Sequence, residues 1–373
     1  MKVLIAGDFC PRYRVEKLIN KDDFARVLSG VKSLTDKADY SIVNYECPVI
    51  KGDASPIQKQ GPNLKSTVKG IEAVKWAGFN CVTLANNHLL DFGETGVHDT
   101  IEACEIFGLD YVGCGNNIFE AEAILNVNLN GQKLAVINCC EHEFCIATDE
   151  SAGCNPLNPI KQYYAIQKAK QEADRVLVIV HGGHEHFQLP SFRMMETYRF
   201  FIDAGADAVV NHHQHCISGY EIYNNKPIFY GLGNFLFDNE YNHNGIWTEG
   251  LVVEIDFTSS IPSFNVYPIS QCAENPSVIL LPENSYDETI ARINNQLGNP
   301  KELKKAIDAF YSEGLSLYTD IFEPCGNRYY FGALRRGWIK SKISTSRFLS
   351  ASNYISCESH RDRLLWWLNK GKN

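Results

Sequence analysis

Short apolar runs along the chain predict six buried β-strands, each followed at once by polar residues. The runs cover residues 3–6, 40–43, 81–84, 176–180, 208–210 and 227–230. The segments after them are Gly7-Asp8, Asn44-Tyr45-Glu46, Asn86-Asn87-His88, His181-Gly182-Gly183-His184-Glu185, His212-His213-Gln214-His215 and Gly233-Asn234-Phe235. An α/β sheet places its active site at the carboxyl ends of its strands. We therefore expect these polar residues to gather on one rim of the fold.

The spacing of apolar residues predicts helices between most of these strands. We expect helices over residues 15–34, 66–77, 94–107, 160–174 and 190–204. Asn130-Gly131 predicts a hairpin turn, and further strands are expected at 207–211, 219–223, 227–231 and 249–257. A chain that begins as alternating strand and helix and becomes mainly strand fits two sheets packed face to face with helices outside.

The pattern changes near residue 272, where we place a domain boundary. Residues 1–272 are predicted to form the α/β domain. Residues 273–373 are predicted to form a mainly helical extension that is basic and rich in aromatic residues, with one or two helices over 285–315.

Charge is distributed unevenly between these two parts. The whole chain carries a net charge of −9, which argues against nucleic acid as a partner. From Cys325 onward, however, the chain has ten Lys and Arg residues and only two acidic residues, Glu358 and Asp362. Such a basic tail can bind an anionic polymer, a membrane surface or an acidic partner. Alternatively, it is a solvated surface, or it folds back onto the acidic body of the same chain.

The cysteine pattern and the N-terminus bear on location. The thirteen cysteines are odd in number and include no Cys-x-x-Cys pair, which favours free thiols. The sequence opens with a strand instead of a signal peptide, and no apolar stretch approaches the ~20 residues that span a bilayer. These features predict a cytoplasmic protein, with association to a membrane surface as the alternative.

Carboxylate and amide side chains in the first two segments suit a divalent cation. Asp8 is either a metal ligand or a helix N-cap, and the neighbouring segments favour the ligand. Strand alternation places Asn44 and Glu46 on one face. We favour Glu46 as the ligand because a carboxylate neutralises charge, with Asn44 supporting it. Arg12 is predicted either to clamp a substrate anion or to form a surface salt bridge.

The next two segments combine metal-binding groups with a proton donor. The carbonyl oxygen of an asparagine in Asn86-Asn87-His88 can bind a hard cation, and His88 is suited to protonate a leaving group near neutral pH. At the end of the fourth strand, His181 is the best ligand. Glu185 is predicted to orient a ligand or to bind a water molecule.

His213-Gln214-His215 is the strongest single element. Histidines at i and i+2 of an extended backbone share one face, so both can address one metal pair. Asn234 is predicted to have a structural role, or to hydrogen-bond a loop or the substrate. Nitrogen and oxygen donors of these types predict a metal-dependent hydrolase that holds two divalent ions, Mn²⁺, Fe or Zn²⁺.

In this order the motifs resemble the CapA (PGA_cap) family of bacterial capsule-synthesis proteins, a branch of the calcineurin-like metallophosphatase superfamily. The matching stretches lie within about residues 1–260 and cover residues 7–8, 44–48, 84–88 with 91–93, 204–207, 212–215 and 226–235. The resemblance implies a four-layer α/β/β/α sandwich of two mixed sheets with a dinuclear centre. It suggests His88 as the general acid and the following metal ligands: Asp8, Glu46, Asn87, His181, His213 and His215.

The resemblance also implies a role in making or trimming poly-γ-glutamate or a related capsule polymer, with an anionic small molecule or polymer as substrate. The first hypothesis is a metal-dependent, phosphoesterase-like hydrolase. The superfamily's first motif is usually Asp-x-His, whereas this chain has Asp8-Phe9-Cys10. That departure, with basic residues such as Arg335 and Lys340, motivates a second hypothesis: a non-catalytic assembly component that binds the polymer or the capsule synthase.

Overall fold

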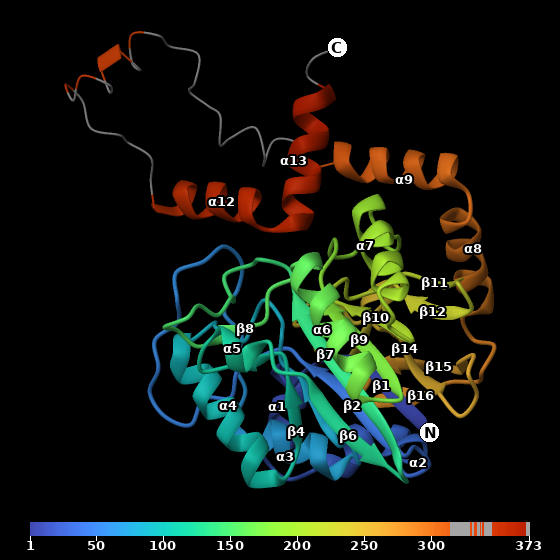
Figure 1. The fold of residues 1–373 in the computed structure, drawn as a ribbon. Helices are drawn as coiled ribbons and strands as arrows, with labels where there is room; N and C mark the ends of the chain where they lie inside the picture. Colours follow the sequence, from blue (N-terminus) through green and yellow to red (C-terminus); the bar gives the residue numbers. More distant parts are fainter. Residues whose placement is uncertain (314–328, 330–331, 334–335, 337, 339–344, 371–373) are drawn as a thin grey trace.

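Two mixed β-sheets form the centre of the computed structural model, which describes residues 1–313, 329, 332–333, 336, 338 and 345–370 (Figure 1). The first sheet has the strand order β16-β15-β14-β1-β2-β3-β4. Along one edge of β1, residues 2–6 pair with β14 and residues 8–10 pair with β13. Its strands are β1 (Lys2–Cys10), β2 (Tyr40–Tyr45), β3 (Cys81–Thr83), β4 (Asp110–Val112), β13 (Asn234–Phe237), β14 (Glu249–Asp256), β15 (Ser263–Gln271) and β16 (Val278–Leu280).

The second sheet has the strand order β11-β12-β10-β9-β7-β6. Its strands are β6 (Leu125–Leu129), β7 (Gln132–Cys140), β9 (Arg175–His181), β10 (Ala208–His212), β11 (Tyr220–Tyr223) and β12 (Lys226–Phe229). A separate two-stranded sheet joins β5 (Cys114–Gly115) to β8 (Gly153–Cys154).

Helices cover the outer faces of both sheets. The first sheet is covered by α1 (Tyr13–Ile19), α2 (Phe24–Thr35), α3 (Val68–Trp76) and α4 (Gly93–Phe107), and the second by α6 (Pro159–Glu172) and α7 (Phe192–Asp203). The remaining elements are α5 (Ile118–Ala121), η1 (Gly245–Trp247), α8 (Asp287–Leu297), α9 (Pro300–Ser312), α12 (Thr345–Ser356) and α13 (Glu358–Lys370).

Strand alternation in β1 accounts for the layers. Val3 and Ile5 pack among residues of the second sheet, whereas Leu4 and Ala6 pack among residues of α1 to α4. Successive side chains of a strand point to opposite faces, so β1 contributes to both the inter-sheet core and the helix-facing core. The predicted four-layer α/β/β/α sandwich with helices in the C-terminal part is confirmed.

Most predicted elements are present, but five strands were missed: β5, β8, β13, β15 and β16. The helix expected over 15–34 is divided into α1 and α2, and Asn130-Gly131 turns the β6–β7 hairpin as predicted. β15 and β16 were not predicted, because Pro268 disfavours a strand interior. The predicted boundary near residue 272 falls between these two strands and stays a prediction. Among the described residues no helix is both long and apolar enough to cross a membrane.

Candidate dinuclear metal centre

Parallel strands β1 and β2 bring Asp8, Asn44 and Glu46 together. The sequence placed Asp8 after the first strand, but it lies inside β1, at a bulge where the register with β2 shifts. Gly7 is required there, since a Cβ would lie 2.0 Å from the carbonyl oxygen of Gly233. Asn44 Nδ2 donates to Asp8 Oδ1 at 2.7 Å and thereby orients the carboxylate.

Glu46 is shared by two groups of side chains whose ligand atoms lie within 4.8 Å of one another. One group is Asp8, Glu46 and His215, and the other is Glu46, His181 and His213. All five residues are buried. Glu46 Oε1 lies 3.6 Å from His181 Nε2 and 3.6 Å from His215 Nε2. This arrangement suits a carboxylate that bridges two cations.

The surroundings of Glu46 fit a cation better than they fit a hydrogen-bond network. Both of its carboxylate oxygens are buried, and neither has a hydrogen-bond partner within the described part of the chain. Burial, followed by the charge of Asp8, raises the pKa of Glu46 well above its ordinary value. A buried acceptor without a donor costs about 1–3 kcal/mol, and a bound divalent cation removes that cost. The residues present therefore fit a metal pair.

His181 is the centre of the second group. Its Nε2 lies 3.0 Å from Asn87 Oδ1 and 3.1 Å from His213 Nδ1. Burial, followed by the charge of His213, lowers the pKa of His181 well below its ordinary value. The imidazole is therefore neutral, which is the form that binds metals. Asn87 reaches this group through the carbonyl oxygen that the sequence singled out.

His215 is held by the strands of the first sheet. Its Nδ1 lies 3.0 Å from Asn234 Oδ1 and 3.3 Å from Asp8 Oδ2. With the proton on Nδ1, the ring donates to these acceptors, and its other nitrogen, Nε2, faces Glu46. A second hydrogen-bonded nitrogen is the usual way in which a metal-binding imidazole is oriented. Asn234 begins β13 instead of closing a strand as the sequence suggested.

The backbone of residues 213–215 is not the extended strand that we expected. β10 ends at His212, and φ is +88° at His213 and +54° at His215. Residues with a side chain seldom adopt this left-handed region, and such strain is kept mainly at functional sites. A tight turn, and not i,i+2 alternation, therefore brings both rings to Glu46.

His88 is oriented by two charged neighbours. The loop bends at Asn86, whose Oδ1 accepts from the His88 amide at 3.1 Å. His88 Nδ1 lies 2.7 Å from Asp91 Oδ2, and Lys59 Nζ lies 3.2 Å from that nitrogen and forms an ion pair with Asp91. Burial, together with the charge of Lys59, lowers the pKa of His88, although Asp91 acts to raise it. Among the described residues, no hydrogen bond is found for Nε2 of His88.

Arg12 and Glu185 lie at the margin of the centre. Arg12 donates to the Tyr13 hydroxyl at 2.9 Å, and its guanidinium lies 5.9 Å from the ring centre of Phe237. Phe237 in turn packs against His215, with ring centres 5.1 Å apart. The salt bridge considered for Arg12 is not found among the described residues, and its role as an anion clamp stays a prediction. Glu185 is exposed and lines the same pocket as His213.

Sequence reasoning missed His212 and Lys59. His212 pairs in register with His181 across β9 and β10, so the two side chains leave the sheet on one face. The ring is buried with both nitrogens unpartnered among the described residues, and its Nδ1 lies 3.6 Å from Asp8 Oδ1. The position of His212 at the end of a strand is the sequence signal that could have identified it. Lys59 lies in a loop where periodicity predicts no side-chain direction.

Cys10 does not take the place of the histidine that the resemblance to metallophosphatases leads one to expect. It is buried in the apolar cluster on the helix side of the first sheet, and it belongs to neither ligand group. Burial raises the pKa of its thiol well above the ordinary value. A neutral buried thiol is a small apolar side chain, so the Asp8 side of the centre has no ligand from this position.

Helices α12 and α13 form one wall of the pocket in front of the centre. The pocket has a volume of about 440 Å³. The residues of the extension that line it are Phe310, Asn353, Cys357, Ser359, His360 and Arg363. The N-terminus of α13 is held by Glu141, whose Oε2 accepts from the backbone nitrogen and the hydroxyl of Ser359 at 3.0 and 2.6 Å. The extension therefore contributes side chains to the candidate site.

Part of the predicted basic tail falls outside the described residues. Those positions are Arg328, Arg335, Lys340, Lys342 and Lys372. Of the remaining basic residues, Arg347 lies on α12, and Arg361, Arg363 and Lys370 lie on α13. Arg363 donates to the carbonyl oxygen of Phe310 at 3.4 Å, which ties α13 to α9.

The contact between His142 and Glu358 makes the docking of α13 depend on pH. The two side chains meet at 2.7 Å. The hydrogen bond with Glu358 raises the pKa of His142 above its ordinary 6.5. Burial acts to raise the pKa of Glu358, but its hydrogen bonds with His142 outweigh burial and lower it below 4.5. The His142 contribution is complete below about pH 6.5 and is lost as pH rises through its raised pKa. The Glu358 contribution is lost only as pH falls below about 4.5.

We therefore expect backbone amides of residues 358–370 to exchange hydrogen faster at about pH 8.5 than at about pH 5.5, after correction for intrinsic rates. His142→Gln should remove most of that difference. Equal protection of wild-type α13 at both pH values would contradict this account.

A family model described as "Bacterial capsule synthesis protein PGA_cap" matches residues 2–239. The chain belongs to this family. The match covers both sheets up to β13, and with them every proposed metal ligand and His88. The helices α12 and α13, which line the pocket, lie outside it.

Two curated relatives carry related descriptions. The "Capsule biosynthesis protein CapA" of Bacillus anthracis is 35% identical over 246 residues, which cover 64% of this chain and 60% of the relative. The "PGA biosynthesis protein CapA" of Bacillus subtilis (strain 168) is 30% identical over 235 residues, covering 62% of each chain. The chain thus spans about 60% of the length of these relatives.

Two solved structures with a similar fold share little sequence identity with this chain. A putative 5'-nucleotidase from Staphylococcus aureus in complex with alpha-ketoglutarate has a TM-score of 0.45 at 13% identity, covering 80% of this chain and 58% of that chain. A hypothetical protein from Thermus thermophilus has a TM-score of 0.45 at 16% identity, covering 76% of this chain and all of that chain.

Proposed function

We propose that this protein is a dinuclear metal-dependent hydrolase that cleaves a phosphoester or a related bond in the synthesis or processing of capsule or poly-γ-glutamate polymer. The observation that carries the proposal is the position of Glu46, which is buried without hydrogen-bond partners among the described residues and shared by two groups of ligands. Membership of the capsule-synthesis family and the names of the two Bacillus relatives support the biological setting.

The proposed roles follow from the contacts around the two groups. One ion would be held by Asp8, Glu46, His215 and, in this chain, His212; the other would be held by Glu46, Asn87, His181 and His213. When bound, such a pair supplies Lewis acidity and a water molecule with a lowered pKa. His88, with Nδ1 held by Asp91, would deliver a proton from Nε2 to the departing oxygen.

The substrate would occupy the pocket between the centre and α13. His360 and Arg363 line it on the side of the extension, and Glu185 and His213 line it on the side of the sheets. His360 Nε2 lies 3.7 Å from Glu143 Oε1, which also lines the pocket, so Arg363 is the side chain of this wall that favours an anionic substrate. A precursor or a segment of an acidic polymer has that character.

Metal analysis with a substrate screen tests the proposal. Protein purified without chelators should contain two divalent transition-metal ions per chain that depend on Glu46, measured as the difference in metal content between wild type and Glu46→Gln. Activity on aryl phosphate mono- and diesters should disappear with a chelator and return with Mn²⁺, Fe²⁺ or Zn²⁺. His212→Ala and His213→Ala should each lower occupancy of a different ion. Protein without bound transition metal, and without metal-restored activity, would sink the proposal.

A non-catalytic role in capsule assembly is the second candidate. The observation that favours it is Cys10, which leaves the Asp8 side without the histidine usual in the superfamily's first motif. His213→Ala separates the two candidates in a cell that makes capsule. An enzyme variant would lose capsule production, whereas an assembly component would retain it and would lose it only when the basic segment after residue 325 is deleted.

A further inference from the structure

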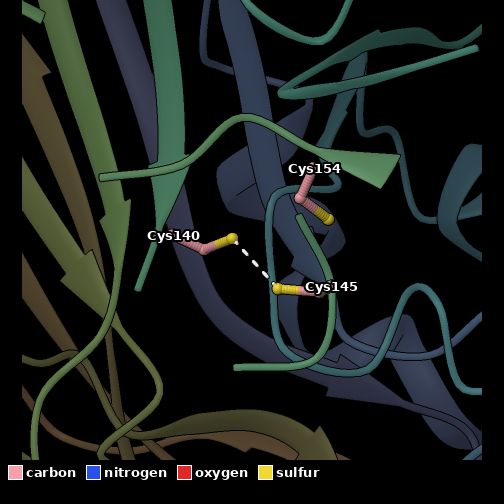
Figure 2. Close-up of side chains that lie close together, drawn as sticks. All are labelled: Cys140, Cys145 and Cys154. Atoms are coloured by element: carbon pink, nitrogen blue, oxygen red, sulfur yellow. Dashed lines mark hydrogen bonds between the residues drawn. The ribbon is translucent and has the colours of Figure 1, made fainter. Parts of the chain in front are cut away.

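We propose that Cys140, Cys145 and Cys154 form a third metal site, which takes a single thiophilic divalent cation of the Zn²⁺ class. Their Sγ atoms lie within 4.8 Å of one another, and all three residues are buried. Figure 2 shows the three side chains approaching one another from the end of β7, from the loop that follows it and from β8.

The spacing of the sulfur atoms suits one ion. Cys140 Sγ lies 3.5 Å from Cys145 Sγ. Zn–S bonds of about 2.3 Å in tetrahedral geometry separate ligand sulfurs by roughly 3.8 Å, so only small side-chain movements are needed. Iron–sulfur clusters are usually held by four protein ligands, whereas three thiols meet here among the described residues, so a single ion is the favoured occupant. The borderline-soft Zn²⁺ ion binds thiolates well.

Apart from their contacts with one another, these thiols lie close to backbone carbonyl oxygens. Cys140 Sγ lies 3.7 Å from the carbonyl oxygen of Asn155, and Cys145 Sγ lies 3.8 Å from that of Glu141. A carbonyl oxygen or a water molecule is therefore in a position to complete a four-coordinate site. The ligand set is chemically distinct from the nitrogen and oxygen donors around Glu46.

The location gives the ion a structural effect on the candidate active site. β8 is held by a two-residue ladder with β5, and the loop of residues 141–152 contains no helix or regular strand. Cys154 Sγ lies 3.4 Å from the carbonyl oxygens of Leu84 and Asn86. An ion at the three thiols would thus fix this loop directly behind the turn that carries Asn87 and His88.

Cobalt substitution distinguishes this site from the centre around Glu46. Metal-free, reduced full-length protein is titrated with Co²⁺, and thiolate-to-metal charge transfer is followed in the near ultraviolet. At saturation we expect the absorption of one thiolate-bound Co²⁺ ion per chain, both in wild type and in His213→Ala, whose second nitrogen–oxygen site is impaired. It should be lost in Cys145→Ser and Cys154→Ser. Cys139→Ser is the matched control and should retain it, because Cys139 neighbours Cys140 on β7 but packs in the other core cluster.

Three outcomes overturn the proposal: no charge-transfer absorption in wild type, its persistence in Cys145→Ser, or a Cys140–Cys145 disulfide found by mass spectrometry of freshly purified, non-reduced protein. If the serine variants do not fold, X-ray absorption at the zinc edge of the His213→Ala protein decides whether sulfur atoms bind the ion. Sulfur neighbours at about 2.3 Å support the site, and only nitrogen and oxygen neighbours overturn it. The experiment measures thiolate ligation alone. A negative result for the three-thiol site therefore leaves the hydrolase proposal standing, and failure of the hydrolase proposal leaves the three-thiol site standing.

Discussion

Glu46→Gln should empty both sites of the dinuclear centre at once, whereas His213→Ala should lower metal content by one ion. Glu46 is the residue common to both groups of ligands, and an amide neither carries the charge nor bridges two cations. Loss of the metal pair removes several kcal/mol of transition-state stabilisation, so turnover should fall on the order of 10³-fold or more. Elemental analysis and phosphoester kinetics on the same preparation measure both effects.

Glu254→Gln is the matched control for this substitution. Glu254 is also largely buried on the first sheet, but its carboxylate is paired with Lys2 at 3.2 Å. That variant should keep both ions. The metal-free Glu46→Gln protein should also be no less stable than metal-free wild type, because the replaced oxygens have no donors among the described residues. A large loss of stability in metal-free Glu46→Gln would instead indicate that Glu46 is a structural residue.

His88→Ala should leave metal content intact and lower turnover by about 10²–10⁴, the usual contribution of general acid catalysis. The contacts of His88 and its neighbour differ: Asn87 Oδ1 lies 3.0 Å from His181 Nε2, whereas His88 Nδ1 lies 2.7 Å from Asp91 Oδ2. Activity on a series of aryl phosphates measures the effect. The loss should shrink for substrates with good leaving groups, which need less protonation.

Asn87→Ala is the comparison that tests this division of roles. It should lower metal occupancy, because it removes a carbonyl oxygen from the group around His181. If His88→Ala strips the metal, or slows activated and unactivated substrates equally, the assignment of His88 as the proton donor is wrong.

The fold and the rim of the site were accessible from the sequence because their signals are local. An apolar run that ends in a polar residue marks the carboxyl end of a strand, and parallel strands bring such ends together. On that basis Asp8, Glu46, His181 and the 213–215 segment were all placed on one rim, where the structure has them. The same reasoning gave the wrong backbone for His213 and His215, since alternation holds only in extended chain and both residues have positive φ.

The tertiary structure decided which of these residues meet and what covers them. The packing of the two sheets decides that both groups share Glu46 and that His212 faces Asp8. Lys59 approaches His88, and α13 approaches the pocket, through loops whose direction no periodicity encodes. Cys140, Cys145 and Cys154 lack a recognisable metal-binding spacing, and only the pairing of β8 with β5 and the path of the 141–152 loop bring their sulfur atoms together. Local pattern therefore determined the strands and the rim, whereas contacts between segments distant in sequence determined the ligand groups.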